Sequence, residues 1–183
     1  MGFSFLIPKK DGRVRWISEF RKLNKLLKRP RYFLPSIPSI MQRRSVFSLI
    51  TQIDMYMGFY TFELDAYAST LCVISTPFCL YQYLRLPMGL TNSSDVFQSV
   101  IHPLFQDMVE VECFIDDIGI LTKCSLEHHL LVVTTVLTIL ESSGFTVNPL
   151  KCAWAVTSTD YLGFLITTDG LKPMPQKLMQ LVV

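Results

Sequence analysis

Two adjacent aspartates, Asp116 and Asp117, lie between two short apolar runs in the second half of the chain. The runs Val111–Ile115 and Ile118–Thr122 have the character of buried strands, and only two residues separate them, which predicts a β-hairpin. Two neighbouring carboxylates at the tip of an apolar hairpin repel each other unless a counter-charge is present. Asp also tolerates the left-handed backbone of a tight turn, so a purely conformational role is the alternative.

The pattern on both sides of this hairpin alternates between strands and helices. A buried strand over residues 50–54 ends in Asp54. Further short strands are expected at residues 3–7, 13–17, 60–64, 71–76, 81–84, 145–147, 154–156 and 161–166. The hairpin 3–17 would turn at Asp11-Gly12, and residues 30–38, with three prolines, should be extended before a short helix near Ile40.

Two longer helices flank the aspartates. One begins at Asn92 or Ser93 and runs to about Phe105, and the other follows a Ser125 cap and stops at Gly144. The apolar stripe of the second helix is read as Leu126, Leu130, Val133, Leu137 and Leu140, and a terminal helix is expected after Pro173. The order predicts an α+β fold, a split β-α-β sheet with helices on one face.

Composition excludes several classes of protein. The chain of 183 residues is half hydrophobic, which excludes intrinsic disorder and fits one domain. Residues 66–84 carry no charge, but their Ser, Thr, Pro and Gln residues favour two buried strands joined by a Pro-Phe turn over a membrane helix. Five cysteines without C-x-x-C spacing, and no secretory signal, indicate reduced thiols in the cytoplasm or nucleus. The three histidines are assigned to surface or helix-face positions.

The positive charge is concentrated near the N-terminus. The segment from Lys9 to Arg44 contains twelve Lys or Arg residues against Asp11 and Glu19. Such a block can neutralise phosphates, which indicates a nucleic-acid partner, whereas a solvated basic face is the alternative.

Asp54 changes the interpretation of Asp116 and Asp117. A split β-α-β sheet can place its strand beside the hairpin, so that three carboxylates meet at one sheet edge. Oxygen ligands of this kind suit hard divalent cations, and two Mg²⁺ ions about 3.5–4 Å apart can promote an in-line phosphoryl displacement. The sequence therefore predicts a site for two Mg²⁺ ions, with Mn²⁺ as a substitute.

Several short strings, in order, resemble the reverse transcriptase of gypsy-type long-terminal-repeat retrotransposons. The string Phe-Ile-Asp-Asp at 114–117 resembles the family's Tyr-x-Asp-Asp box. It occurs with Pro-Lys-Lys-Asp-Gly (8–12), Val-Arg-Trp-Ile (14–17), Phe-Arg-Lys-Leu-Asn-Lys (20–25), Ile-Asp-Met (53–55), Leu-Pro-Met-Gly-Leu (86–90), Phe-Gln (97–98), Leu-Lys-Cys (150–152) and Tyr-Leu-Gly-Phe (161–164). The resemblance runs from Phe3 to about Lys177. Phe114, Ser94 and Cys79 stand where the family has Tyr and often Pro and Gly.

The resemblance implies a polymerase palm with a partial fingers hairpin. Residues 1–183 would form one partial domain, about 1–45 fingers and about 46–175 mainly palm. The thumb, RNase H, protease and integrase parts of a polyprotein would be missing.

The resemblance also implies roles for individual residues. Asp54 and Asp116 would be the main metal ligands, with Asp117 assisting and the Met55 carbonyl completing one metal shell. A second set would bind the deoxynucleotide: Lys9, Arg15, Phe59, Met88, Gly89 and Lys151. Lys9 and Arg15 would contact the triphosphate, Phe59 would exclude a ribose 2′-hydroxyl, and Lys151 would act near the pyrophosphate. Leu162 and Gly163 would hold the primer end.

Three hypotheses follow for the activity. The first is RNA-directed DNA synthesis on a primer–template with dNTPs. The second is an inactive retroelement remnant that folds as a palm and at most binds nucleic acid. The third is a different two-metal enzyme such as a nuclease. The Asp-Ser-Gly or Asp-Thr-Gly signature of a retroviral-type protease is absent from the sequence.

Overall fold

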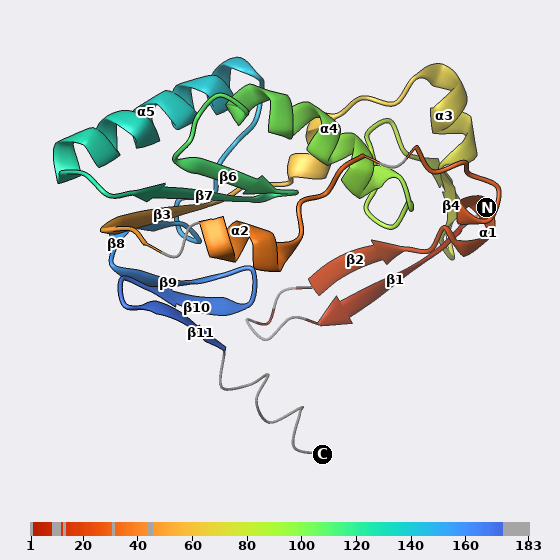
Figure 1. Cartoon of the computed structure of the whole chain (residues 1–183). Helices are drawn as coiled ribbons and strands as arrows, with labels where there is room; N and C mark the ends of the chain where they lie inside the picture. Colours follow the sequence, from red (N-terminus) through yellow and green to blue (C-terminus); the bar gives the residue numbers. More distant parts are fainter. Residues whose placement is uncertain (1, 9–11, 13, 31, 44–45, 174–183) are drawn as a thin grey trace. The chain divides into compact units, whose positions relative to one another are not determined.

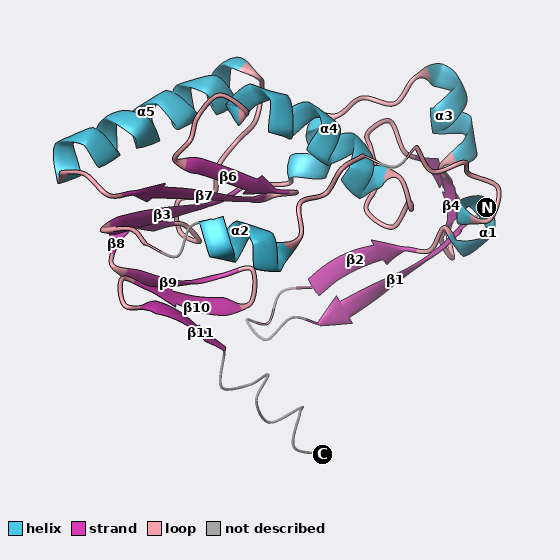
Figure 2. Cartoon of the chain, in the orientation of Figure 1, coloured by secondary structure: helices cyan, strands magenta, loops and turns pink. Residues whose placement is uncertain are grey.

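A computed structural model (Figure 1) describes residues 2–8, 12, 14–30, 32–43 and 46–173. The chain forms two compact units that are interleaved in sequence. The first combines the residues up to Tyr32 with Met57–Phe97, and the second combines Phe33–Tyr56 with the residues from Gln98 onward. Figure 2 shows that both units mix helices and strands.

The first unit contains a four-stranded sheet in the order β2-β1-β4-β5. Strands β1 (Gly2–Pro8) and β2 (Val14–Ser18) pair antiparallel, which confirms the predicted N-terminal hairpin. Strand β4 (Val73–Ser75) lies parallel to β1, and β5 (Leu80–Gln82) completes the sheet. All three residues of β5 are exposed, so the prediction of a buried strand was wrong there.

The remaining elements of the first unit are short helices: α1 (Arg21–Asn24), η1 (Gly58–Thr61) and α3 (Ala66–Leu71). The prediction of a strand over residues 60–64 was wrong, whereas the strand predicted over 71–76 is confirmed as β4, which begins at Val73 after α3 ends at Leu71. The Asp65 side chain accepts a hydrogen bond from the Ala68 N–H at 2.7 Å, which is a helix N-cap. Asp65 was the sequence signal for α3.

The turn between β4 and β5 does not need glycine. The Thr76 hydroxyl donates to the Cys79 carbonyl oxygen at 2.8 Å and accepts from the Cys79 N–H at 3.2 Å. Cys79 is not among the residues with positive φ. The side chain of Thr76 thus stabilises a turn in which Cys is accommodated without backbone strain.

Helix α4 (Ser93–Phe105) begins in the first unit and ends in the second, with the predicted bounds. Its first turn contains Asp95, of which only 2% is exposed. The Asp95 carboxylate accepts hydrogen bonds from Arg29 Nε (2.6 Å) and from the Tyr32 N–H (3.1 Å). The bond from Arg29, more than any other contact, lowers the pKa of Asp95.

The second unit is built on an antiparallel sheet in the order β6-β7-β3-β8. Strand β3 (Leu49–Asp54) lies between β7 (Asp117–Thr122) and β8 (Ala153–Val156), and β6 (Val111–Phe114) forms the edge beside β7. The predicted adjacency of the strand ending in Asp54 and the hairpin is confirmed.

Helix α5 (Leu126–Ser142) packs against one face of this sheet. Its Ser125 cap is confirmed, because the Ser125 hydroxyl accepts from the His128 N–H. The predicted apolar stripe was wrong in part: Leu126 and Leu130 are exposed, and the buried residues are His129, Val132, Val133, Val136 and Leu140. Two β-branched valines in succession place the buried face about a quarter of a turn away from the leucines.

His129 is fully buried, so of the two positions expected for it, surface or helix face, it takes the helix face, on the buried side of α5. Its Nε2 lies 2.7 Å from the Thr51 hydroxyl of β3, and its Nδ1 lies 2.8 Å from the Thr122 hydroxyl of β7. Burial is the main cause that lowers the pKa of His129. His129 therefore connects the two central strands from the α5 side.

The opposite face of the sheet is covered by α2 (Ile37–Arg43) and by a second sheet. That sheet has the order β11-β10-β9, formed by Ser158–Tyr161 (β9), Phe164–Thr167 (β10) and Gly170–Pro173 (β11). The two sheets and α2 share one hydrophobic core, which is formed by Ile40, Phe47, Ile50, Leu121, Tyr161 and Ile166. The strand predicted over 161–166 is thus two strands with a turn, and the predicted terminal helix lies outside the described residues, because β11 ends at Pro173.

Two negative findings apply to the described part of the chain. None of its helices has the length and apolar character needed to cross a membrane. Its five cysteines are free thiols.

Candidate active site

Asp54 and Asp117 are directly paired across strands β3 and β7. Asp117 is also paired with Phe114 of β6. These three residues form one cross-strand rung, here called the acidic rung, at the end of the sheet. Because side chains alternate along a strand, the side chains of Asp54 and Asp117 point to the same face.

The hairpin turn is one residue away from the predicted position. Strand β7 begins at Asp117, so the two turn residues are Ile115 and Asp116. The positive φ falls on Ile115 (56°), and neither aspartate has one. The left-handed conformation, costly for a β-branched residue, thus falls on Ile115, and the alternative in which the aspartates serve only to provide it is excluded.

A buried glutamine on α4 holds this turn in place. The Ile115 N–H donates to Gln98 Oε1 at 2.7 Å, and Gln98 Nε2 donates to the Cys113 carbonyl oxygen at 3.1 Å. Gln98 is fully buried. Two fixed hydrogen bonds of this kind offset the conformational cost of Ile115.

A lysine side chain contacts the acidic rung. Lys151 Nζ lies 3.1 Å from Asp54 Oδ1 and 3.2 Å from Asp54 Oδ2. Burial, with the charges of Asp116 and Asp54, raises the pKa of Asp117 to about 6, while a Gln52 hydrogen bond and the Lys151 charge act in the opposite direction. Three carboxylates and a lysine therefore influence one another electrostatically at this end of the sheet.

The backbone of Asp54 is also held. Its N–H donates to Cys152 Sγ (3.3 Å), and its carbonyl oxygen accepts from the Asn148 N–H (2.9 Å). The next residue, Met55, is buried and forms a β-bridge with Val147. The segment around 147–152 thus fixes where strand β3 ends.

In this arrangement, no three His, Cys, Asp or Glu side chains among the described residues are grouped so that they could hold a metal ion. The chemistry of the donors nevertheless suits a hard cation, because Asp54, Asp116 and Asp117 offer only oxygen. A cation, the Lys151 ammonium, already lies against both oxygens of Asp54.

Leu162 and Gly163 form a tight turn between β9 and β10. Tyr161 pairs with Phe164, and both intervening residues have positive φ, 50° and 81°. This is the pattern of a type I′ hairpin turn. Leu162 packs against the core cluster of the second unit.

Four other predicted nucleotide-binding residues belong to the first unit: Arg15, Phe59, Met88 and Gly89. The Phe59 ring is 5.0 Å from the Phe97 ring and is half-buried. Met88 is exposed and precedes Gly89, whose φ is 104°. Arg15 is part of β2, and Lys9 lies outside the described residues.

Gly89 is fixed by both conformation and space. A Cβ atom there would lie 2.9 Å from the Ser18 carbonyl oxygen. Asn24 Nδ2 donates to the Gly89 carbonyl oxygen, and Asn24 Oδ1 accepts from the Thr91 N–H, both at 2.9 Å. Glycine is therefore required at this turn.

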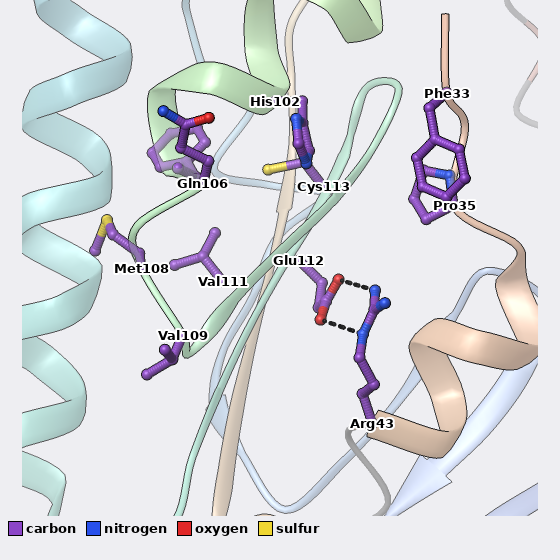
Figure 3. A pocket seen from close by; sticks show the side chains of 11 residues that line it. Phe33, Pro35, Arg43, His102, Gln106, Met108, Val109, Val111, Glu112 and Cys113 are labelled. Atoms are coloured by element: carbon purple, nitrogen blue, oxygen red, sulfur yellow. Dashed lines mark hydrogen bonds and ion pairs between the residues drawn. The ribbon is translucent and has the colours of Figure 1, made fainter.

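A cavity of about 570 Å³ opens beside the edge strand β6 (Figure 3). Arg43 Nη2 donates to Glu112 Oε2 at 3.0 Å, and Arg43 Nε donates to Oε1 at 3.3 Å. Phe33, Pro35 and His102 also line the cavity. The three aspartates of the site do not line it.

Three residues near the aspartates had no role assigned from the sequence: Gln52, Gln98 and Cys152. Gln98 and Cys152 occur in the strings Phe-Gln and Leu-Lys-Cys, so their position in the motifs was a signal. Gln52 had a signal in periodicity, because it is two residues from Asp54 and points to the same face.

Comparisons with known proteins agree with these observations. A family model described as "Reverse transcriptase (RNA-dependent DNA polymerase)" matches residues 7–166. The chain is 30% identical over 186 residues to the "Retrovirus-related Pol polyprotein from transposon 297" of Drosophila melanogaster, covering 98% of the chain and 18% of that protein. It is 30% identical over 166 residues to the corresponding protein from transposon gypsy of the same organism, covering 90% of the chain and 16% of that protein. The chain thus spans under a fifth of the length of these relatives.

Solved structures show the same fold. The foamy viral protease-reverse transcriptase in complex with double-stranded DNA has a TM-score of 0.91 at 22% identity, covering 99% of this chain and 32% of that chain. The same type of protein with an RNA/DNA hybrid has a TM-score of 0.86 at 22% identity, covering all of this chain and 25% of that chain. These likenesses confirm the predicted α+β palm fold.

Proposed function

Since the chain belongs to the reverse transcriptase family, we propose that it contains the core of an RNA-directed DNA polymerase. The reaction joins a deoxynucleotide to the 3′-hydroxyl of a primer paired with an RNA template. The observation that supports it most is the pairing of Asp54 with Asp117, next to Asp116. Family membership alone would not distinguish an intact set of acids from a decayed one.

Asp54, Asp116, Asp117 and the Met55 carbonyl would hold the two Mg²⁺ ions. When bound, such ions lower the pKa of the primer hydroxyl and neutralise charge on the leaving pyrophosphate. The pKa of Asp117, raised to about 6, means that this carboxylate is only half ionised near pH 6 and becomes fully ionised well above it. Lys151, beside Asp54, is suited to donate a proton to the pyrophosphate or to balance its charge.

The remaining residues would bind the substrates. Lys9 and Arg15 are proposed to contact the triphosphate, and Met88 and Gly89 to line the nucleotide pocket. Phe59 would exclude the ribose 2′-hydroxyl. The Leu162-Gly163 turn would support the primer end.

The domain assignment belongs to the same proposal. About residues 1–45 would be part of the fingers and about 46–175 mainly palm. The thumb, RNase H and integrase would belong to a longer polyprotein. The foamy viral proteins similar to this chain bind double-stranded DNA and RNA/DNA hybrids, which supports primer–template as the partner.

Primer extension tests the proposal. The chain is incubated with a labelled DNA primer on an RNA template, dNTPs and Mg²⁺ or Mn²⁺. We expect template-directed incorporation that Asp116→Asn lowers by about 10²-fold or more, because loss of one metal ligand removes several kcal/mol of transition-state stabilisation. Asp107→Asn, at an exposed acid, is the matched control.

Three outcomes would contradict the proposal. Salt-sensitive binding of nucleic acid without incorporation by the wild-type chain would support an inactive remnant. Release of nucleotides from labelled nucleic acid without incorporation would support a nuclease. Incorporation that Asp116→Asn leaves unchanged would exclude the proposed acids.

A further inference from the structure

Lys151 contacts the carboxylate that is proposed to bind metal. Both oxygens of Asp54 are within 3.2 Å of the ammonium, so the lysine faces the carboxylate in the direction from which a cation would approach. The Lys151 side chain is 50% exposed and that of Asp54 is 30% exposed. A pair with this exposure is weak and readily exchanged, because water screens it and the flexible lysine loses entropy in forming it.

The main chain holds Lys151 in place independently of this ion pair. The Lys151 N–H donates to the Asn148 carbonyl oxygen at 3.0 Å, and the Asn148 N–H donates to the Asp54 carbonyl oxygen at 2.9 Å. Cys152 accepts from the Asp54 N–H and donates to the Asn148 carbonyl oxygen. The lysine stem can therefore swing away while its Cα stays next to Asp54.

The carboxylates around it need positive charge. Asp54 is paired with Asp117 across β3 and β7, and Asp116 is next to Asp117 in the chain, so three carboxylates lie at one end of the sheet. The Lys151 ammonium, which contacts both oxygens of Asp54, offsets part of the repulsion among them. A divalent cation would compensate the repulsion more strongly, because Coulomb energy scales with charge.

We propose that Lys151 is an exchangeable counter-ion: its ammonium neutralises Asp54 in the metal-free protein and is displaced when a divalent cation binds the aspartates. This inference rests on the proposed metal site and adds a linkage to it. The lysine competes with the metal, and the metal releases the lysine. The released ammonium is then free to contact an anionic group bound at the site.

Acetylation of the lysine amine measures this release directly. The wild-type chain is treated with an amine-acetylating reagent with and without Mn²⁺, and modification of Lys151 is followed by mass spectrometry. We expect Mn²⁺ to accelerate acetylation of Lys151 about threefold or more, because an amine held against both oxygens of Asp54 is less accessible to the reagent than a released one. Lys123, an exposed lysine of the same unit, is the internal control and should not respond. In Asp54→Asn, Lys151 should react fast with or without Mn²⁺.

Mn²⁺ binding, measured by electron paramagnetic resonance of the free ion, tests the reverse linkage. Lys151→Gln should bind Mn²⁺ about threefold to tenfold more tightly than the wild type, Lys151→Arg should not, and Lys123→Gln should match the wild type. Binding to Lys151→Gln alone would also support the exchange.

The failures of the two proposals are distinguishable. If Mn²⁺ binds the wild-type chain and leaves the acetylation of Lys151 unchanged, the exchange is excluded while the metal site stands. If neither the wild type nor Lys151→Gln binds Mn²⁺, both the metal site and the exchange are excluded.

Discussion

Two rungs on the same face of the sheet each contain a carboxylate, and the two carboxylates differ in exposure and in the cation that contacts them. The acidic rung joins Phe114, Asp117 and Asp54, and the next rung on the same face, here called the Glu112 rung, joins Glu112, Gly119 and Gln52. The two rungs are about 7 Å apart, the rise of two residues. The Glu112 side chain is 10% exposed and receives a two-point contact from Arg43, whereas Asp54 is 30% exposed and faces Lys151.

The difference shows that one sheet can contain both an ion pair that stabilises the fold and an ion pair that can be exchanged. The planar guanidinium of Arg43 fits both oxygens of Glu112. Lys151 is a point charge on a flexible stem, and its contact with Asp54 is open to solvent. We infer that Glu112 has a permanent partner and Asp54 a replaceable one.

Arg43→Ala should have the largest effect on stability. Removing the guanidinium from a buried carboxylate should lower the free energy of unfolding by about 2–3 kcal/mol, somewhat less than for a fully buried pair because Arg43 is half exposed. Urea denaturation measures it. Arg21→Ala, which removes an exposed two-point contact with Glu19, is the matched control and should leave the free energy of unfolding nearly unchanged. Equal losses in both variants would contradict the assignment.

Gly119→Ala tests the packing of the Glu112 rung. A Cβ there would lie 2.9 Å from Tyr161 Cζ, and Tyr161 is fully buried with its hydroxyl donating to the Glu112 carbonyl oxygen at 3.2 Å. Overpacking of this kind should cost about 2 kcal/mol in urea denaturation. The double variant Gly119→Ala/Tyr161→Leu should lose less than the sum of the two single variants. Strict additivity would show that the two residues do not clash.

Asp117→Asn should stabilise the protein at neutral pH. The folded pKa of Asp117 is about 6, above its usual value of 3.8, so the folded state binds a proton that the unfolded state releases. Stability from this group is therefore present below about pH 4 and is lost as the pH rises through 6. At pH 8 the variant should gain about 1 kcal/mol, discounted because the side chain is partly exposed. Thermal unfolding at pH 4 and pH 8 checks it, and an equal gain at both values would refute the shift.

Lys151→Gln should have the smallest effect on stability. Its loss should change the free energy of unfolding by under about 0.5 kcal/mol in metal-free buffer, because the pair is exposed. Urea denaturation of Lys151→Gln and Arg43→Ala side by side compares the free energy of unfolding that each ion pair contributes. A loss above about 2 kcal/mol would show that the Lys151–Asp54 pair is structural.

The sequence predicted the elements that depend on local pattern. The hairpin 3–17, the strand ending at Asp54, the bounds of α4 and the Ser125 cap of α5 follow from alternation and from polar residues at helix starts. The α5 stripe was wrong because Leu and Val are equally apolar, and only the neighbouring sheet decides which of them is buried. His129 was missed for the same reason, since its partners Thr51 and Thr122 lie on other strands.

The site was predictable only as a set of acids. Periodicity and motif order predicted that Asp54 lies beside the hairpin. The shift of the turn to Ile115, however, depends on Gln98, which is seventeen residues away in sequence. The contact between Lys151 and Asp54 spans 97 residues and follows from main-chain bonds of Asn148 and Cys152. Long-range hydrogen bonds of this kind have no local sequence pattern.

Ile115 determines when the tip of the hairpin becomes ordered. Its left-handed backbone and its bond to Gln98 form when the sheet and α4 come together, so the direction of Asp116 is decided during folding and not by the arrival of a ligand. A chain with a freely moving tip would have to order it again for every ligand that binds. In this protein the conformational entropy of the tip is lost once per molecule, when the chain folds.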